Sequence, residues 1–246
     1  MNDFFSVANR GESLADQVYR QLAAGLLEGQ YSPGQRVNMR ALAEAMGVSQ
    51  TPVREALTRL ISEGVLRNGS RAIEVPLVDS ANFEEIFRLR LMLEGDLAER
   101  AAPRLTPALL ADQVRIQDQF DRAMEARDFK LGLKLNVAFH FALYRAAGQD
   151  ISLQLVEKLW LLIGPSMNLM YPALASGRSP RHARILQAMH TGKPGPLRKA
   201  VEDDINTARE KIFDLLPVIE ARILAQTSPA PVVRRPVGRP RKTAKV

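Results

Sequence analysis

The sequence predicts a mainly α-helical protein with two folded parts. Residues 11–78 are expected to form a winged helix-turn-helix, and residues 79–226 an antiparallel helical bundle. Short helical patterns separated by glycine and proline turns mark the first part. From residue 79 onwards, apolar residues recur at helical spacing and no strand pattern appears. An Asn68-Gly69-Ser70 turn between two short apolar runs predicts a β-hairpin near the junction.

Composition excludes several classes of protein. The chain has 246 residues and no cysteine, which excludes disulfides, thiolate metal sites and cysteine nucleophiles and fits a reducing compartment. No run of about 18 uncharged apolar residues is present, and the N-terminus lacks the pattern of a signal peptide. We therefore expect a cytoplasmic protein without a membrane partner.

Positive charge is concentrated at the C-terminus. The net charge is +7, and six of these charges lie in residues 228–246, which contain no acidic residue. The rest of the chain is therefore nearly neutral, so its overall basicity does not make the folded part a nucleic-acid binder. We expect a flexible arm over residues 1–10 and an unpacked basic tail over residues 227–246.

The first part contains three helices and a hairpin. Ser13 is a plausible N-cap for the first helix, and a short second helix over residues 38–46 is stopped by Gly47. Ser49 then caps a third helix, which ends at Gly64. Helix, helix, turn, helix and hairpin is the order of a winged helix-turn-helix.

The third helix has two faces. Its apolar side is formed by Val53, Ala56, Leu57, Leu60 and Ile61, and its outer side carries Gln50, Thr51, Arg54 and Thr58. The major groove of DNA accepts one helix, and arginine matches phosphates and guanine edges with two donors at once. Spacing alone is equally compatible with an ordinary three-helix module that has a solvated polar face.

The segment Gly47-Val-Ser-Gln-Thr-Pro-Val-Arg-Glu-Ala-Leu-Thr-Arg-Leu60 closely resembles the DNA-binding domain of the GntR family of bacterial transcription regulators. The resemblance implies double-stranded DNA as the partner. It places at the DNA-contact positions Arg40, Ser49, Gln50, Thr51, Arg54 and Gly69. Most family members carry arginine where this chain has Gln50. Because glutamine suits adenine and arginine suits guanine, we expect a shifted base preference at this position.

The second part reads as successive amphipathic helices. A helix from Ile151 to Met170 is expected to be broken or bent at Gly164-Pro165 and to be followed by a loop over Tyr171–Pro180. The last two helices are expected over Arg181–His190 and Leu197–Leu216. Bundle interiors can hold ligands or metals, and His140 lies at an inward position one turn after Asn136. A lone histidine of this kind is more often a packed core residue than a ligand.

The pattern Asn136-x-x-Phe139-His140, then His182, then Ala200-x-x-x-Asp204, resembles the FCD effector domain of the FadR subfamily. Many members bind a divalent metal there through one aspartate and three histidines. The resemblance implies a ligand set of Asn136, His140, His182 and Asp204, which departs from that pattern at its first and last positions. Two imidazoles and a carboxylate still suit zinc, nickel or manganese. Whether a metal binds stays open.

Arg90 is the candidate contact for an effector. A metal with open positions and an arginine in the same cavity would attract a small carboxylate. The alternative is an intrahelical pair with Glu94, four residues later, which is a common surface arrangement.

The tail sequence Gly238-Arg239-Pro240 with flanking arginines resembles an AT-hook, which implies that Arg239 enters a narrow A·T minor groove. A nonspecific basic tail is the alternative.

Taken together, these features predict a homodimeric, ligand-responsive regulator that binds an inverted-repeat operator. Repression relieved by ligand is the commoner arrangement in the family, so we expect a repressor. Two alternatives remain: a metal-dependent enzyme using the His140 and His182 pocket, and an architectural protein that binds A/T-rich DNA through its tail.

Overall fold

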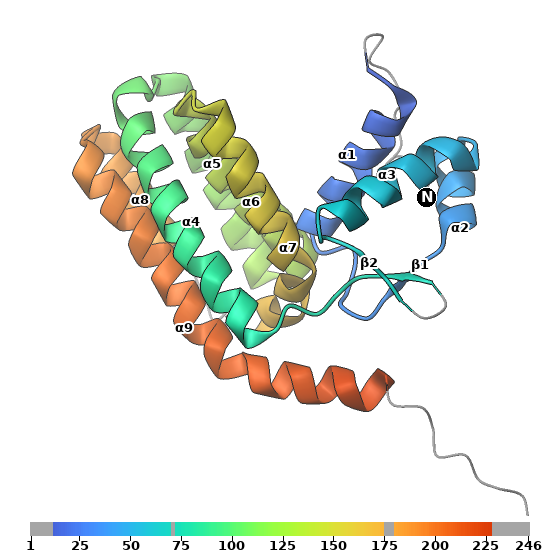
Figure 1. The fold of residues 1–246 in the computed structure, drawn as a ribbon. Coiled ribbons are helices and arrows are strands. Elements are labelled where there is room, and N and C mark those ends of the chain that lie inside the picture. Colours follow the sequence, from blue (N-terminus) through green and yellow to red (C-terminus); the bar gives the residue numbers. More distant parts are fainter. Residues whose placement is uncertain (1–11, 70–71, 175–179, 228–246) are drawn as a thin grey trace, which may run out of the picture.

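The computed structural model describes residues 12–69, 72–174 and 180–227, and these residues are mainly helical, as the sequence predicts (Figure 1). Two cores of buried apolar side chains are present. One lies within the N-terminal helices and short sheet, and the other fills the helical bundle. The predicted arm, residues 1–10, and the AT-hook-like segment around Arg239 lie outside the described residues.

The N-terminal unit contains the three predicted helices: α1 (Leu14–Leu27), α2 (Met39–Met46) and α3 (Gln50–Ser62). The Ser13 hydroxyl accepts a hydrogen bond from the Asp16 backbone N–H and caps α1, as expected. Gly47 ends α2 with φ of 66°, a left-handed conformation that glycine adopts at little cost. The apolar side of α3 is buried at Val53 and Leu60.

Ser49 occupies the N-cap position of α3, but its hydroxyl makes no capping hydrogen bond. The predicted N-cap position of Ser49 is therefore confirmed, but the capping hydrogen bond is absent. The serine is exposed at the start of α3, beside the polar side of the helix.

A three-stranded antiparallel sheet completes this unit. The predicted hairpin is present as β2 (Arg67–Asn68) and β3 (Ile73–Glu74). A third strand, β1 (Arg36–Val37), pairs with β3 and gives the order β1-β3-β2. Sequence analysis missed β1 because two residues are too short to show an alternating pattern. The buried Val37 and Val75 attach the sheet to the helices.

Within its described residues, the bundle contains seven helical elements: α4 (Ser80–Ala101), the 3-10 turn η1 (Ala102–Arg104), α5 (Pro107–Glu125), α6 (Phe129–Ala146), α7 (Asp150–Leu174), α8 (Pro180–Thr191) and α9 (Pro194–Thr227). Figure 1 shows α4 and α9 side by side along the bundle, with α7 on the side that faces the N-terminal unit, and α8 packs on α9. Thr106 and Asp128 cap the starts of α5 and α6 through their side chains.

Three expectations about the later helices need correction. Helix α7 is not broken at Gly164-Pro165 but continues to Leu174, and Tyr171–Leu174 and Pro180, expected in a loop, belong to α7 and α8. Helix α9 does not end at Leu216. It passes through Pro217, whose ring crowds the carbonyl one turn earlier, and Figure 1 shows α9 changing direction in this region.

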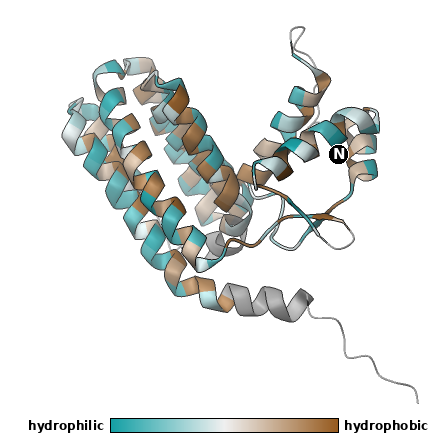
Figure 2. Cartoon of the chain, viewed as in Figure 1, coloured by the Kyte–Doolittle hydropathy of each residue, from teal (hydrophilic) through white to brown (hydrophobic). Residues whose placement is uncertain are grey.

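Helix α7 packs against the N-terminal unit. Leu161 is 5% exposed and belongs to the core of that unit. A Cβ added at Gly164 would lie 2.6 Å from the backbone oxygen of Leu26 in α1. The glycine therefore serves close helix contact rather than a break. Figure 2 shows apolar residues along α7 where it meets α1.

Among the described residues, no helix combines the length and the apolar character that crossing a membrane requires.

Candidate functional site

The polar side of α3 is open to solvent. Gln50, Thr51 and Arg54 are all exposed, as is Ser49 at the helix start. Within the described part of the chain, the side chains of Gln50, Thr51 and Arg54 have no hydrogen-bond or ion-pair partner. The sequence prediction that these residues face outward is confirmed, and their donors and acceptors are available to another molecule.

Other arginines of the N-terminal unit are engaged within the protein. Arg59 lies over the Tyr19 ring at 3.8 Å and bonds Glu63 at 3.0 Å, so it fastens α1 to the end of α3. Arg40 pairs with Glu44 at 2.9 Å, but both side chains are largely exposed. Arg40 can therefore exchange this weak surface pair for another anion.

Gly69 lies directly after β2, next to residues 70–71, which are not described. A Cβ added there would lie 2.5 Å from the carboxyl carbon of Glu74. That carboxylate also lies between Arg36 at 3.9 Å and Arg67 at 3.6 Å. Glycine at this position leaves room for the glutamate that holds the two strand arginines together.

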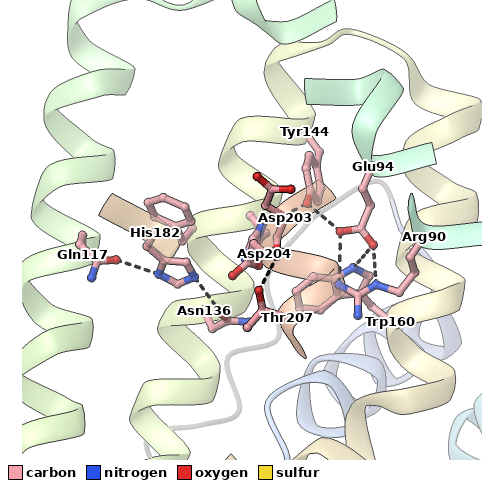
Figure 3. Close-up of polar contacts among 12 residues, drawn as sticks. Arg90, Glu94, Gln117, Asn136, Tyr144, Trp160, His182, Asp203, Asp204 and Thr207 are labelled. Carbon is pink, nitrogen blue, oxygen red and sulfur yellow. Dashed lines mark hydrogen bonds and ion pairs between the residues drawn. The ribbon is translucent and has the colours of Figure 1, made fainter. Parts of the chain in front are cut away.

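The four residues expected around a metal come together in the bundle, and Figure 3 shows three of them, Asn136, His182 and Asp204. One ligand atom from each of His140 on α6, His182 on α8 and Asp204 on α9 lies within 4.8 Å of the others. His140 Nε2 is 3.3 Å from Asp204 Oδ2, and His182 Nε2 is 3.1 Å from Asn136 Oδ1. Both imidazoles are almost fully buried.

These distances and donor types fit a divalent cation. Ligand nitrogen and oxygen atoms lie about 2.0–2.2 Å from zinc, so neighbouring ligands on one ion are separated by about 3.0–3.4 Å at tetrahedral or octahedral angles. The two observed separations lie in this range. Imidazole nitrogen with carboxylate and amide oxygen is a donor set accepted by zinc, nickel and manganese.

A buried polar network adjoins this cluster. Glu94 is fully buried and accepts hydrogen bonds from Arg90 Nε at 2.5 Å, Trp160 Nε1 at 2.9 Å and the Tyr144 hydroxyl at 2.7 Å. The Arg90 guanidinium also lies over the Trp160 ring at 4.4 Å. The expected pair of Arg90 with Glu94 therefore forms, but in the interior instead of on the surface.

The network reaches the candidate metal ligands through Tyr144, whose hydroxyl is 3.2 Å from His140 Nδ1. On the other side, the Oε1 atom of Gln117 is 2.8 Å from His182 Nδ1. Sequence analysis did not single out Gln117, Tyr144 or Trp160. The i, i+4 spacing of His140 and Tyr144 was a usable signal, whereas nothing in the sequence connects Gln117 with His182.

The sequence matches two family descriptions: bacterial regulatory proteins of the gntR family over residues 14–72, and the FCD domain over residues 85–207. The HTH-type transcriptional regulator McbR of Escherichia coli is 35% identical over 163 residues, which cover 66% of this chain and 74% of McbR. The solved structure of E. coli McbR/YncC superposes with a TM-score of 0.73 at 28% identity and covers 82% of this chain and 99% of that one.

A further relative is the putative L-lactate dehydrogenase operon regulatory protein of E. coli, 25% identical over 76% of this chain and 82% of its own length. These relatives and families are transcriptional regulators and not enzymes. The chain belongs to the GntR family of bacterial transcriptional regulators, with an FCD domain after its DNA-binding domain.

Proposed function

We propose that this regulator reads an operator with the polar side of α3 and responds to a small carboxylate in the bundle. The observation that carries the first part is the exposed trio Gln50, Thr51 and Arg54, unpaired among the described residues, above a buried apolar side. A helix of this kind fits the major groove, and in this proposal Arg40 and Ser49 contact the adjacent backbone phosphates.

The DNA contact is tested with Arg54→Ala. Loss of a base-contacting arginine should weaken operator binding by about 1–3 kcal/mol and relax the base preference at one position. Arg100→Ala is the matched control, because Arg100 is an exposed arginine on α4 that pairs with Asp96 in the bundle. Fluorescence anisotropy on a selected operator measures both variants. Equal affinity of Arg54→Ala and wild type would contradict the proposed contact.

Dimerisation is supported by exposed apolar side chains on two helices in contact. Ile151 and Leu155 lie one turn apart on α7 and are 79% and 49% exposed, and Met92 on α4 is 60% exposed. Burial of Ile151 and Leu155, which form an apolar patch on α7, against a second copy would give a two-fold symmetric dimer. Two recognition helices would then meet half-sites of an inverted repeat about one helical turn apart.

Ile151→Lys with Leu155→Lys is expected to give monomers and to weaken operator binding. Val114→Lys is the control, since Val114 is an exposed apolar residue on α5, away from this patch. Sedimentation velocity reports the mass of each variant. A monomeric wild-type protein at the concentrations that bind operator would contradict the proposal.

The cluster of Asn136, His140, His182 and Asp204 would hold a divalent metal, which when bound would supply open coordination positions for a carboxylate. Arg90 lies in the adjoining network paired with Glu94, and a carboxylate in the site would compete with Glu94 for its guanidinium. The protein's own residues would fix the metal ligands and exclude water from the buried side of the site. A relative named for regulating an L-lactate dehydrogenase operon agrees with a small carboxylate as the signal.

Helix α7 is the proposed route from this site to the DNA-binding unit. Trp160 bonds Glu94 and its ring centroid lies 5.5 Å from that of His140, while the next residue, Leu161, packs in the core of the N-terminal unit. A shift of α7 at the site would therefore move α1, which packs on α3. By linkage, an effector that weakens operator binding must bind the operator complex more weakly than the free protein.

Elemental analysis of protein purified without chelator tests the metal. We expect close to one zinc, nickel or manganese ion per chain in wild type and loss of the ion in His140→Ala. A thermal-shift screen with lactate, succinate and related carboxylates then tests the effector, because binding to the native state raises the melting temperature. Protein without metal that still responds equally to carboxylates would contradict the role of the metal.

An architectural role through the tail is a second candidate, favoured by the six cations without an acid in residues 228–246. Deletion of this segment should weaken DNA binding and flatten its dependence on salt. Binding that survives Arg54→Ala and ignores operator sequence would favour the tail over α3.

A further inference from the structure

The sheet of the N-terminal unit carries a row of three charged side chains. Its central strand is β3, and Glu74 on β3 is paired with Arg36 of β1 on one side and with Arg67 of β2 on the other. Successive side chains of a strand point to opposite faces, so this row lies on the face opposite to the buried Val37 and Val75. The row is therefore on the solvent side of the sheet.

The two arginines of the row are held by charge, and their hydrogen-bond donors are not used. Arg36 Nε lies 3.9 Å from Glu74 Oε1, and Arg67 Nη2 lies 3.6 Å from Glu74 Oε2. Both distances exceed the length of a hydrogen bond. Both arginine side chains are more than half exposed, and neither has another partner within the described part of the chain. Their N–H groups are therefore available to an oxyanion from outside.

The row lies at the turn of the hairpin and near the start of α2. The backbone N–H of Gly69 donates to the Ala72 carbonyl at 2.8 Å, and a Cβ on Gly69 would lie 2.5 Å from the carboxyl carbon of Glu74. Arg36 precedes Arg40 by four residues, so their Cα atoms are at most about 14 Å apart. The row thus adjoins the surface on which the proposed function places backbone phosphates.

We propose that the row is a second DNA-contacting surface, in which Arg36 and Arg67 bind backbone phosphates and Glu74 weakens this binding by competing for both guanidiniums. The inference rests on the operator binding proposed above. Charge-assisted bonds between arginine and phosphate are strong, whereas an exposed ion pair contributes little, so a phosphate can displace Glu74. The displaced carboxylate stays beside the phosphate and repels it.

The row and α3 should affect DNA binding differently, because phosphates carry no sequence information. Loss of a row arginine should weaken binding to every duplex by the same factor, whereas loss of Arg54 should weaken mainly the binding of the operator. Each phosphate contact that is lost should also reduce the slope of log affinity against log salt concentration by about 0.9.

The variants Arg36→Ala and Arg67→Ala test the two arginines in the full chain. Fluorescence anisotropy at several salt concentrations gives the affinity for a selected operator and for an unrelated duplex of equal length. We expect both affinities to fall by the same factor, with the shallower salt slope. Arg88→Ala is the matched control, because Arg88 is an exposed arginine on α4 whose pair with Glu85 is also 3.9 Å long. Wild-type affinity and slope in both row variants would overturn the proposal, as would a loss confined to the operator.

Glu74→Gln tests the competition, because glutamine keeps the shape of the side chain and removes its charge. We expect it to bind both duplexes about two- to fivefold more tightly, the range of an exposed charge pair. In the double variant Arg36→Ala with Arg67→Ala, the same change should have a smaller effect, since no guanidinium is left to compete for. Weaker binding of Glu74→Gln, or an equal gain with and without the arginines, would overturn the role of Glu74. Thermal melting first shows that each variant is folded.

The outcomes separate this inference from the proposed reading of the operator by α3. If Arg54→Ala loses the preference for the operator while the row variants bind like wild type, the row alone is contradicted. If Arg54→Ala keeps the preference while the row variants weaken binding to both duplexes, the reading by α3 is contradicted and the row is supported.

Discussion

The two parts of the molecule treat their polar side chains in opposite ways. In the N-terminal unit, Gln50, Thr51 and Arg54 stand in solvent and have no partner among the described residues. In the bundle, Arg90 and Glu94 are buried and bonded to each other. A surface that leaves its donors and acceptors free suits a large partner with matching groups. Beside this pair, ligand atoms of His140, His182 and Asp204 lie within 4.8 Å of one another, an arrangement that suits a small cation.

The same difference predicts different responses to mutation. Exposed and unpaired side chains can be removed with little effect on folding, whereas removal of one member of a buried network leaves charges and donors without partners. The following changes test this contrast, from the largest expected effect to the smallest.

Glu94→Ala should have the largest effect. It leaves the Arg90 charge and the Tyr144 and Trp160 donors buried without their acceptor, which should lower the free energy of unfolding by about 3–5 kcal/mol. Urea denaturation followed by circular dichroism measures the loss. Asp96→Ala, which breaks a largely exposed pair on the same helix, should leave the midpoint nearly unchanged.

Glu94→Leu combined with Arg90→Met refines this test. Replacement of both charges by apolar side chains should recover the part of the loss that comes from the unpaired Arg90 charge, whereas the Tyr144 and Trp160 donors stay without an acceptor. If Glu94→Ala costs no more than Asp96→Ala, the buried network is not the stabilising element that the contrast requires.

Gly164→Ala tests the contact between the two parts. The added methyl would lie 2.6 Å from Leu26 O, a backbone atom, so α7 and α1 must separate. Overpacking of this kind costs about 1–3 kcal/mol, and the operator affinity should change as well. Gly195→Ala is the control, because nothing lies within 4 Å of its new Cβ. Identical unfolding and operator binding of Gly164→Ala and wild type would contradict a close helix contact.

Tyr19→Phe should have the smallest effect, and it depends on pH. Burial, followed by the hydrogen bond to Glu63, raises the pKa of Tyr19 from 10.0 to about 12. The folded protein therefore favours the protonated phenol, so the stability from this group is complete below pH 10 and is lost as the pH rises toward 12. Denaturation midpoints of wild type and Tyr19→Phe should converge over that interval. A constant difference up to pH 12 would contradict the shift.

The N-terminal fold was largely predictable because its signals are local. Caps, left-handed glycines and an apolar side at helical spacing specify α1 to α3, and the same spacing exposes Gln50 and Arg54. The strand β1 was not predictable, since two residues carry no periodicity. The absence of a capping hydrogen bond at Ser49 was not predictable either, because it depends on a side-chain rotamer that the sequence does not determine.

In the bundle the histidines were predictable, but their surroundings were not. His140 and His182 stood out by residue type and by the FCD resemblance. Gln117 and Trp160 meet them only through helix packing, across 65 residues in the case of Gln117 and His182. Gly164 was misinterpreted because a glycine-proline pair usually marks a break, whereas here tertiary contact with α1 requires the glycine.

Operator reading by α3 depends most on contact of Gln50 with a base edge. Selection of binding sites from random DNA by wild type and by Gln50→Arg measures this directly. We expect both proteins to select the same inverted repeat, except for one position in each half-site at which adenine is replaced by guanine. Identical selected sequences from the two proteins would contradict the claim that the polar side of α3 reads the operator.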